Sequence, residues 1–341
     1  MSNATLIGID LGKHWFFLHA QDSHGHQIWR RKVSRAQLLA LLANTPACII
    51  AMEACGGAHW LARQLQALGH QPRLIAPQFV RPFVKGNKTD FADAEAICEA
   101  ASRPAMRRVP VKTPEQQVLL ALHRVREALM SERIVLTNQI HAFLLEFGIS
   151  LPTGMSAIRR LPELLDAPPH PLPPPIVALL LRLQQRVGQL QAELAELDAQ
   201  LKRELAQNDA ARRLLTIPGI GPITASSLIA TAGDARAFRR GRNFAAALGL
   251  VPRQHSTGGR INLLGISKRG DKHLRSLLVH GARAVIRCVQ RRTDALGLWV
   301  QALLQRHHVN VVACALANKM ARIAWAILAR GGEYRAHPAL T

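Results

Sequence analysis

The stretch Thr5-Leu6-Ile7-Gly8-Ile9-Asp10-Leu11-Gly12 decides the fold at the start of this 341-residue chain. Its apolar run at 5–9 has the length of a buried β-strand, and it ends at a carboxylate that a glycine soon follows. Two more strand-like runs follow at 15–20 and 27–33, with a polar turn between them. The opening of the chain therefore predicts three strands that follow one another as hairpins.

Helices and strands alternate over the rest of the first hundred residues. Ser34 is placed to cap a helix, and a buried strand runs up to Glu53 before two glycines interrupt it. The predicted segments are a helix at 35–43, a strand at 47–52, a helix near 58–68 and a strand at 73–76. This order predicts an α/β domain at 1–110, in which helices cover a mixed sheet.

The middle of the chain, residues 111–210, is predicted to be helical. Apolar residues recur at helical spacing over 115–147, which indicates a long amphipathic helix. Six prolines in the eight positions 168–175 predict a stiff linker that cannot be helical. A short heptad series follows at 183–201, and it fits either a helical hairpin within the chain or a coiled coil between chains.

Positive charge is concentrated in the last part of the chain. The formal net charge is +22, and residues 211–341 carry 21 Lys and Arg against 4 Asp and Glu, a net +17. Such a field favours a polyphosphate or an anionic membrane as partner over a small neutral substrate. Aromatic residues make up only 4% of the chain, which argues against broad base-stacking platforms. Residues 211–341 are predicted to form a compact, mostly helical, basic domain.

Cysteine use and hydropathy indicate the compartment. The five cysteines include no CxxC pair, so neither a disulfide framework nor a zinc site is expected. The N-terminus lacks the pattern of a signal peptide, and apolar runs such as 309–317 are shorter than the ~20 residues of a membrane span. We therefore expect a cytoplasmic protein with no membrane partner.

Four carboxylates in the first domain stand where a metal site could form. Asp10 and Glu53 end strands, whereas Asp90 and Asp93 lie three apart and so share one face of a helix. Carboxylate oxygens suit Mg²⁺, with Mn²⁺ as an alternative, and a pair of such ions can stabilise the attacking and leaving oxygens of phosphoryl transfer. The pattern predicts a metal site on these four residues.

Other interpretations of the same residues stay open. Asp90 and Asp93 could complement the dipole of a helix capped by Thr89, and Asp10 and Glu53 could be ordinary turn and helix-entry residues. The segment 7–12 also resembles the first phosphate loop of actin-like ATPases and sugar kinases. The sequence shows neither the second glycine-rich loop nor the adenosine motif of those proteins.

The segment 215–225, Leu-Thr-Ile-Pro-Gly-Ile-Gly-Pro-Ile-Thr-Ala, matches a helix-hairpin-helix pattern. Gly219 and Gly221 lie on either side of an apolar residue, as a tight hairpin requires. Backbone N–H groups and the following helix N-terminus can hold a DNA phosphate without reading its sequence. A simple connection between two helices is the alternative.

A serine lies among basic residues further on, in the segment 250–260. Ser256 has Arg253, His255 and Arg260 near it in sequence, beside a pair of glycines. A hydroxyl in such a setting is a candidate nucleophile toward phosphate, because arginines neutralise developing charge. An ordinary flexible loop fits equally well. The residues that follow predict a helix start that faces phosphates: Lys268, Arg269, Lys272 and Arg275.

These motifs in this order resemble the DEDD-type transposases of bacterial insertion sequences related to the Piv DNA invertase, in the sister group of insertion-sequence family one hundred and ten. The resemblance covers nearly the whole chain. The motifs that carry it are IGID at 7–10, MEACG at 52–56, NKTDFADA at 87–94, IPGIG at 217–221, LGLVPRQHSTGG at 248–259 and ISKRGD at 266–271.

The resemblance implies a RuvC-like, RNase H-type N-terminal domain, a helical coiled-coil segment and a C-terminal transposase domain. It assigns the DEDD tetrad to Asp10, Glu53, Asp90 and Asp93, and the nucleophile to Ser256. An ungapped comparison with more distant members places Thr257 there instead. The resemblance also implies guidance by a structured noncoding RNA, the bridge RNA, that pairs with target and donor DNA.

The sequence therefore predicts a site-specific recombinase that moves an insertion sequence through a covalent phosphoserine intermediate. Its expected partners are donor and target DNA, a guide RNA and copies of itself, as a dimer or tetramer near the nucleoid. A RuvC-like nuclease that resolves branched DNA by water attack is the alternative. A third possibility is a non-enzymatic nucleic-acid-binding protein.

Overall fold

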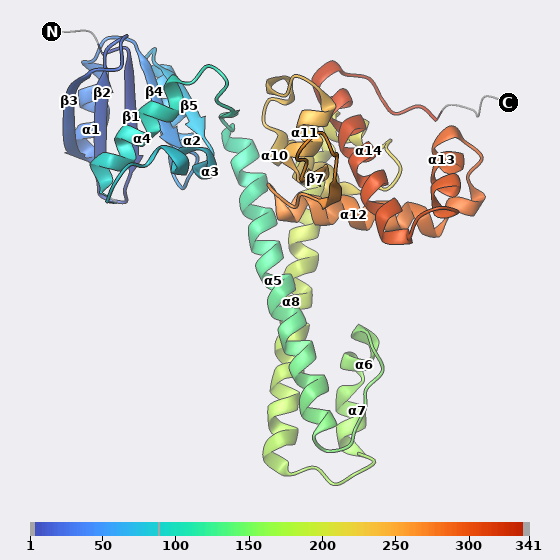
Figure 1. Cartoon of the computed structure of the whole chain (residues 1–341). Coiled ribbons are helices and arrows are strands. Elements are labelled where there is room, and N and C mark those ends of the chain that lie inside the picture. Colours follow the sequence, from blue (N-terminus) through green and yellow to red (C-terminus); the bar gives the residue numbers. More distant parts are fainter. Residues whose placement is uncertain (1–3, 88, 337–341) are drawn as a thin grey trace. The chain divides into compact units, whose positions relative to one another are not determined.

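The computed structural model describes residues 4–87 and 89–336, so Lys88 of the NKTDFADA motif lies outside the described residues. The chain forms two compact units, Met1–Thr113 and Pro114–Thr341 (Figure 1). The first unit corresponds to the predicted α/β domain. The helical segment expected at 111–210 lies in one unit with the basic C-terminal part, where we expected three separate segments.

A six-stranded mixed sheet forms the centre of the N-terminal unit, in the order β3-β2-β1-β4-β5-β6. The first strand pairs in parallel with β4 and antiparallel with β2, and β4 pairs in parallel with β5. The predicted strands are confirmed, and a short sixth strand at the edge was not predicted. The strands are β1 (Leu6–Leu11), β2 (Trp15–Gln21), β3 (Gln27–Ser34), β4 (Ile49–Glu53), β5 (Gln71–Ile75) and β6 (Arg108–Val109).

Helices cover both faces of this sheet, and the alternation of buried side chains divides its core in two. Ile7 and Ile9 of β1 pack on the face covered by α1 (Arg35–Ala43) and α2 (Ala58–Ala67), whereas Leu6 packs on the other face. That other face carries α3 (Pro77–Val80) and α4 (Asp90–Ser102). Every second residue of β1, starting from Leu6, thus points toward α4.

Gly8 is the point where α4 crosses β1. A Cβ atom at this position would lie 2.3 Å from the Ala94 carbonyl oxygen and 2.9 Å from the Cys98 sulfur. Cys98 is fully buried and its thiol donates to the His19 carbonyl at 3.2 Å. Only glycine allows this close approach of helix and strand. The contact brings the start of α4 toward the end of β1.

Two long helices of the C-terminal unit, α5 (Pro114–Leu145) and α8 (Pro174–Ala206), run side by side (Figure 1). Leu190, Leu194 and Leu201 of the heptad series are buried, and Arg126 of α5 pairs with Asp198 of α8 at 2.6 Å. The heptad residues therefore pack within the chain, as the helical-hairpin alternative expected.

The proline-rich segment was predicted to be wholly non-helical, and this is wrong at its end. Pro174 and Pro175 form the first turn of α8. Proline is tolerated there because the first N–H groups of a helix have no partner within the helix. Two short helices before the segment, α6 (Met155–Arg159) and α7 (Leu161–Asp166), were not predicted.

The rest of the C-terminal unit is mostly helical, as expected. Its core gathers buried residues from α14 and the five α-helices α9 to α13, including Phe244, Leu278 and Met320. The elements are α9 (Asp209–Leu214), α10 (Pro222–Ala232), α11 (Gly241–Ala247), β7 (Pro252–Gln254), β8 (Leu263–Ile266), α12 (Lys272–Arg287), α13 (Ala295–Leu304) and α14 (Val309–Arg330).

Helix α14 is long and apolar enough to cross a membrane by length and composition alone, and it is the single such helix in the described chain. Buried core helices pass the same test. Half of its most apolar window is buried, and Leu316, Ala317 and Ala321 are fully covered by the surrounding helices. Its apolar residues thus serve the core of the C-terminal unit.

A buried histidine of the α5–α8 hairpin forms a hydrogen bond to helix α10. His123 of α5 is 3% exposed, and its Nε2 atom lies 2.8 Å from the Ser226 hydroxyl of α10. Burial lowers the pKa of His123 to about 4, and the nearby His273 and Arg126 lower it further. The ring is therefore neutral near pH 7, as a buried hydrogen-bonded group should be.

Candidate active site

The ends of β1 and β4 bring Asp10 and Glu53 together. These strands are parallel neighbours, and the last aligned pair is Ile9 with Met52. Each carboxylate is the next residue along its strand. Ile9 and Met52 belong to the core on the α1 and α2 face, so alternation turns the following residues toward the α4 face. The two carboxylates therefore end neighbouring strands on one face of the sheet.

The first turn of α4 lies against the same end of the sheet. Phe91 packs edge-on against Phe17 of β2, with ring centroids 5.0 Å apart, and Phe17 is the cross-strand partner of Asp10. Asp90 and Asp93, on either side of Phe91 in the sequence, are thus held at the strand end that carries Asp10. All four members of the predicted tetrad come from this one edge.

Capping of α4 is also present. The Thr89 hydroxyl accepts a hydrogen bond from the Ala92 N–H at 3.2 Å, and both aspartates lie in the first turn. The interpretation of Asp90 and Asp93 as residues that complement the helix dipole therefore holds in the structure as well. The two roles are compatible, because a carboxylate can stabilise a helix start and still offer an oxygen to a cation.

Electrostatics at this edge reflect the gathered negative charge. Burial raises the pKa of the Cys55 thiol first, and the charges of Glu53 and Asp10 raise it further. Both carboxylates therefore act on one nearby sulfur. Within residues 4–87 and 89–336, three or more His, Cys, Asp or Glu side chains do not converge on a single point. Mg²⁺ needs only one or two carboxylates besides water, so this set of hard oxygen donors fits a divalent ion.

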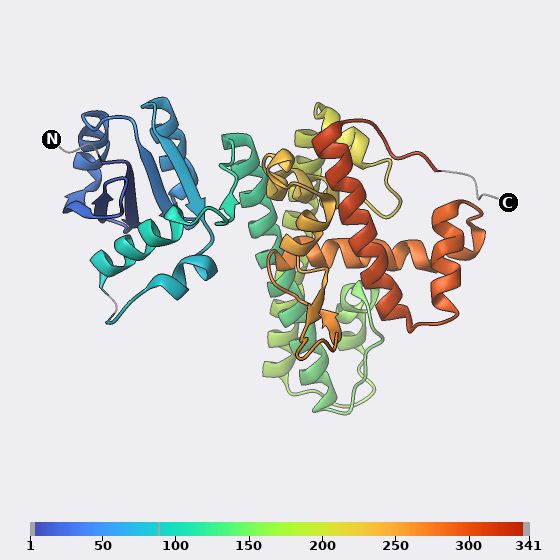
Figure 2. The ribbon, with the colours of Figure 1, turned by 45° about the horizontal axis from the view of Figure 1, so that its top comes forward.

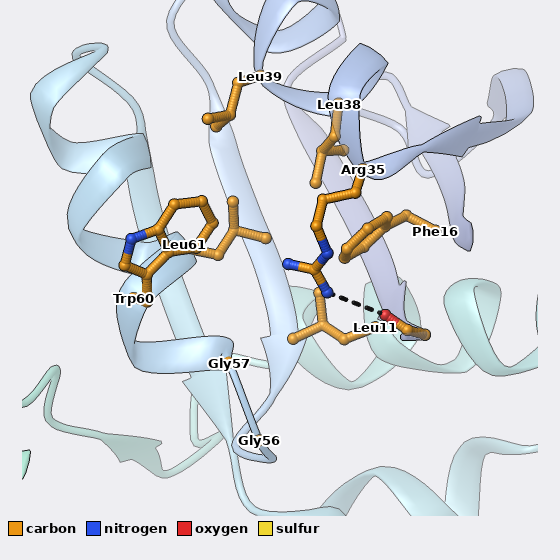
Figure 3. A pocket seen from close by; sticks show the side chains of 10 residues that line it. Leu11, Phe16, Arg35, Leu38, Leu39, Gly56, Gly57, Trp60 and Leu61 are labelled. Atoms are coloured by element: carbon orange, nitrogen blue, oxygen red, sulfur yellow. Dashed lines mark hydrogen bonds between the residues drawn. The ribbon is translucent and has the colours of Figure 1, made fainter. Parts of the chain in front are cut away.

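A small pocket lies on the opposite face of the same edge, between α1 and α2 (Figure 3). The Arg35 guanidinium enters it, where it donates to the carbonyls of Lys13 at 3.1 Å and Gly12 at 3.5 Å. The same group lies 4.9 Å from the Phe16 ring centroid. The Arg35 side chain thus fastens the strand end behind Asp10, and the pocket is separate from the face that carries the carboxylates.

Ser256 lies on the hairpin formed by β7 and β8, in which residues 252–265 are exposed. Its tip is a two-residue turn, in which Gly258 and Gly259 have φ of 56° and 75° and the Arg260 N–H donates to the Thr257 carbonyl at 3.0 Å. Two successive positive φ angles are typical of a type I′ hairpin turn. The paired glycines therefore serve a tight hairpin, rather than the flexible loop considered as an alternative.

The predicted cluster of basic residues around Ser256 is only partly seen. Ser256 accepts a hydrogen bond at 2.8 Å from the Gln254 side chain, two residues earlier. Arg253 and His255 flank Gln254 in the sequence, and Ser256 lies just beyond the end of β7. Thr257 pairs with Arg260. In the described part of the chain, no hydrogen bond links Ser256 to any of the three basic residues.

The segment that matches a helix-hairpin-helix joins α9 to α10. Gly219 has φ of 83°, and a Cβ atom there would lie 2.6 Å from the Gly281 carbonyl oxygen of α12. This glycine is thus required by packing inside the unit. Gly221 is exposed, and a Cβ atom there would have no neighbour within 4 Å. The open end of the hairpin is therefore at Gly221 and the start of α10.

The remaining predicted phosphate contacts lie around the start of α12. Lys268 and Arg269 precede the helix, and Lys272 is its first residue, behind an Asp271 cap that accepts from the Leu274 N–H at 2.8 Å. Arg275 differs, because its guanidinium donates to the Leu248 carbonyl at 2.9 Å. Part of the donor capacity of Arg275 thus serves the fold.

Comparison with known proteins covers almost all of these elements. Residues 7–149 match the IS110-type DEDD transposase model, and residues 211–296 match the model described as Transposase IS116/IS110/IS902 family. The transposase for insertion sequence element IS1328 of Yersinia enterocolitica is 56% identical over 97% of this chain and 98% of its own length. The chain belongs to the IS110/IS116/IS902 family of DEDD transposases.

Two further relatives place this transposase within its family. The transposase for insertion sequence element IS1111A of Coxiella burnetii is 41% identical over 98% of this chain and 92% of its own length. The pilin gene-inverting protein of Moraxella bovis is 40% identical, but over only 21% of this chain and 22% of its own length. The predicted kinship with a DNA-inverting protein is thus confirmed at a distance.

Family membership settles the general activity. This transposase acts on DNA in the transposition of an insertion sequence, and its DEDD domain implies the use of a divalent metal ion. The alternative of a nuclease that only resolves branched DNA is not favoured, since the relatives that match over 92% or more of their own length are named as transposases.

Gln254 is the residue near the candidate nucleophile that sequence reasoning missed. Its side-chain amide donates to the Ser256 hydroxyl, and it is itself exposed. The signal was present, because residues two apart on a strand share a face. This spacing could predict the Gln254–Ser256 contact only once the segment was known to form a hairpin and not a flexible loop.

Proposed function

We propose that this transposase cuts and rejoins DNA through a covalent phosphoserine intermediate, in which the carboxylates of the N-terminal unit and Ser256 act on the same phosphate. The observation that carries the proposal is the placement of the DEDD residues at one end of the sheet. Asp10 and Glu53 end neighbouring parallel strands on the face that the acidic first turn of α4 crosses. Such an edge suits the binding of a cation that in turn binds phosphate.

Asp10, Glu53, Asp90 and Asp93 would hold Mg²⁺, or Mn²⁺ in its place. A bound ion would neutralise the charge that develops on the scissile phosphate. The protein holds Asp10 and Glu53 by strand pairing and the two helical aspartates by the contact between Phe91 and Phe17. The carboxylates are thus positioned before substrate arrives, which is the condition for efficient electrostatic stabilisation.

In the chemical step, the Ser256 hydroxyl oxygen attacks phosphorus and loses its proton to solvent. A new bond forms from the serine oxygen to phosphorus while the bond to the leaving sugar oxygen breaks, and that oxygen takes up a proton. The Gln254 amide, which donates to the same hydroxyl, would stabilise negative charge on the attacking oxygen. Attack by a hydroxyl of the exchanged strand reverses the step and restores serine.

The basic residues of the C-terminal unit would hold nucleic acid beside Ser256. We assign phosphate contacts to Gly219, Gly221, Arg253, Arg260, Lys268, Arg269, Lys272 and Arg275. Gly219 and Arg275 would act mainly through the fold, because both already contact the protein interior. The expected partners are donor and target DNA, a structured noncoding guide RNA and further copies of the chain, as a dimer or tetramer associated with the nucleoid in the cytoplasm.

A recombination assay with an element-derived DNA pair tests the proposal. Wild-type protein with Mg²⁺ and the candidate noncoding RNA should give recombinant DNA and a protein–DNA adduct on a denaturing gel. EDTA should remove both products. Ser256→Ala should abolish the adduct while it leaves DNA binding intact, because it removes only the attacking oxygen.

Thr257→Ala is the matched control, since Thr257 lies next to Ser256 in the sequence and carries a hydroxyl of its own. It should retain the adduct. An adduct that survives in Ser256→Ala and disappears in Thr257→Ala would move the nucleophile by one residue. Cleaved DNA ends without any covalent protein would contradict the phosphoserine mechanism as a whole.

A further inference from the structure

An open groove of about 980 Å³ lies between the β7–β8 hairpin and helices α13 and α14. Figure 2 shows the hairpin, in orange, beside α14, in red. The walls of the groove include Leu264 and Ile266 of the hairpin. Val311 and Cys314 of α14 contribute apolar surface opposite them. The groove thus borders the element that carries Ser256, and most of its lining residues belong to no motif of the sequence.

Every charged residue that lines this groove is basic. Arg253 and Lys268 come from the hairpin side, and Lys319 and Arg322 come from α14. A second hollow shares Lys319 and Arg322 and adds Arg240 and other residues, again without an acidic side chain. The two hollows therefore form one cationic path along α14. Such a path suits a polyanion that runs lengthwise.

The groove also contains an aromatic ring. Trp299 of α13 lines it, and the Lys319 amine lies 4.7 Å from the centroid of the Trp299 ring. The chain has only five tryptophans in 341 residues. One of them thus lines the groove, partly buried against the core, and a base of any sequence can stack on its ring when the Lys319 amine moves from the ring to a phosphate.

Lys268 is held in an unusual backbone conformation at the edge of the groove. Its φ is 56°, and no other non-glycine residue in the described part of the chain has a positive φ. The Lys268 N–H donates to the Gly249 carbonyl at 3.1 Å, and the Ser267 N–H donates to the Val251 carbonyl at 2.8 Å. Strain of this kind is kept where the surrounding structure fixes it, and it occurs often at functional sites.

We propose that this groove holds an unpaired polynucleotide strand, with a base on Trp299 and phosphates at Lys319 and Arg322. An apolar lining with one aromatic ring favours an unpaired strand, because a duplex hides the faces of its bases. The inference rests on the proposed function in one respect, since it places the strand beside the Ser256 hairpin. It names three recognition residues, Trp299, Lys319 and Arg322, that the motifs do not contain.

Binding of a short fluorescent oligonucleotide to the full-length protein tests the groove. Trp299→Ala should weaken binding of an unpaired strand about tenfold, the scale of one base stack. It should leave binding of an abasic strand of equal length unchanged. The control is Trp60→Ala, which removes a tryptophan that is 42% exposed in the N-terminal unit, and it should bind both strands like the wild type.

The cations are tested by salt dependence. Lys319→Ala/Arg322→Ala should lower the slope of log affinity against log salt by about 1.4, because each phosphate of a single strand that a cation neutralises adds about 0.7 to the slope. Lys202→Ala/Arg203→Ala removes two exposed charges from α8 and should keep the wild-type slope. Since Arg322 is exposed, Arg322→Ala alone tests the groove without a change in core packing, and it should lower the slope by about half as much.

DNA and RNA strands of one sequence, tested in parallel, identify which polynucleotide the groove holds, and a Trp299 effect on either supports the proposal. Wild-type affinity of Trp299→Ala for both strands would overturn it. So would an equal decrease of slope in the α8 control, because general surface charge would then explain the binding. The Ser256→Ala variant should bind strands normally, so failure of the phosphoserine mechanism and failure of the groove give different results.

Discussion

The carboxylate edge of the N-terminal unit and the serine hairpin of the C-terminal unit hold their reactive groups in different ways. Asp10 is the penultimate residue of β1 and Glu53 is the last residue of β4, and the preceding residues of these two central strands are almost all buried between two layers of helices. Ser256 lies on a two-stranded hairpin that is exposed over residues 252–265. One group is set by the core of a unit, whereas the other is set by a turn and a few hydrogen bonds at the surface.

This difference suits the different chemical roles that we propose for the carboxylate edge and the serine hairpin. A metal site needs several oxygens held in place at once, which buried strands and a packed helix provide. A nucleophile that must meet a phosphate on a large substrate benefits from a hairpin whose exposed hydrogen bonds open at low cost. We therefore expect substitutions at the two places to act on different properties of the protein.

The largest effect is expected at the carboxylate edge. Asp10→Asn should lower recombination at least about a thousandfold, since removal of a ligand takes away several kcal/mol of charge stabilisation in the transition state. DNA binding should remain, because the basic residues are elsewhere. The measurement is the yield of recombinant DNA with Mg²⁺.

Asp22→Asn provides the matched control for Asp10→Asn. Asp22 lies in the turn between β2 and β3, where its side chain accepts from the N–H groups of His24 and His26, and Asn can still accept both bonds. Its recombination should stay near that of the wild type. If Asp10→Asn retained a tenth of the wild-type yield, the carboxylate edge would not be the metal site.

A smaller effect is expected where α4 crosses β1. Gly8→Ala places a Cβ atom 2.3 Å from the Ala94 carbonyl oxygen, so the helix must shift, and this should cost about 1–3 kcal/mol of unfolding free energy. Gly56→Ala adds the same methyl group where nothing lies within 4 Å. Urea unfolding followed by circular dichroism should separate the two. Equal stability of both variants would show that the close approach is not a constraint.

The smallest effect is expected at the tip of the serine hairpin. Gly258→Ala puts a side chain at a φ of 56° and should cost about 1 kcal/mol locally, with no change in the unfolding midpoint of the protein. The adduct yield should fall roughly fivefold. Gly258→Asn should behave like wild type, because asparagine accepts this conformation in type I′ turns. A wild-type adduct yield in Gly258→Ala would show that the turn does not position Ser256.

The N-terminal unit could be predicted from sequence because its signals are local and repeated. Strand-length apolar runs ended at Asp10 and Glu53, and the order of helices and strands predicted a mixed sheet, in which the structure pairs these two strands in parallel. In the C-terminal unit, the prediction that the proline-rich segment is wholly non-helical was wrong at its end. Pro174 and Pro175 form the first turn of α8, the one place in a helix where proline fits. Local propensity thus failed at this point because position within the helix decided the outcome.

The C-terminal unit was harder to predict because its surfaces depend on distant contacts. Gly219 matched a DNA-binding hairpin, yet the structure also gives it a close contact with Gly281 of α12. Trp299, Lys319 and Arg322 show no pattern in the sequence, and only the packing of α13 and α14 against the β7–β8 hairpin brings them into one groove. Spacing along the chain cannot reveal such a surface.

The most direct test of the joint action of the two parts is to map the protein–DNA adduct. After recombination with Mg²⁺, the adduct is digested with protease and nuclease, and the modified peptide is sequenced by mass spectrometry. We predict a nucleotide on Ser256 in the wild type and no adduct in Asp10→Asn. A nucleotide on Thr257, or an undiminished Ser256 adduct in Asp10→Asn, would contradict the joint action of these carboxylates and this serine.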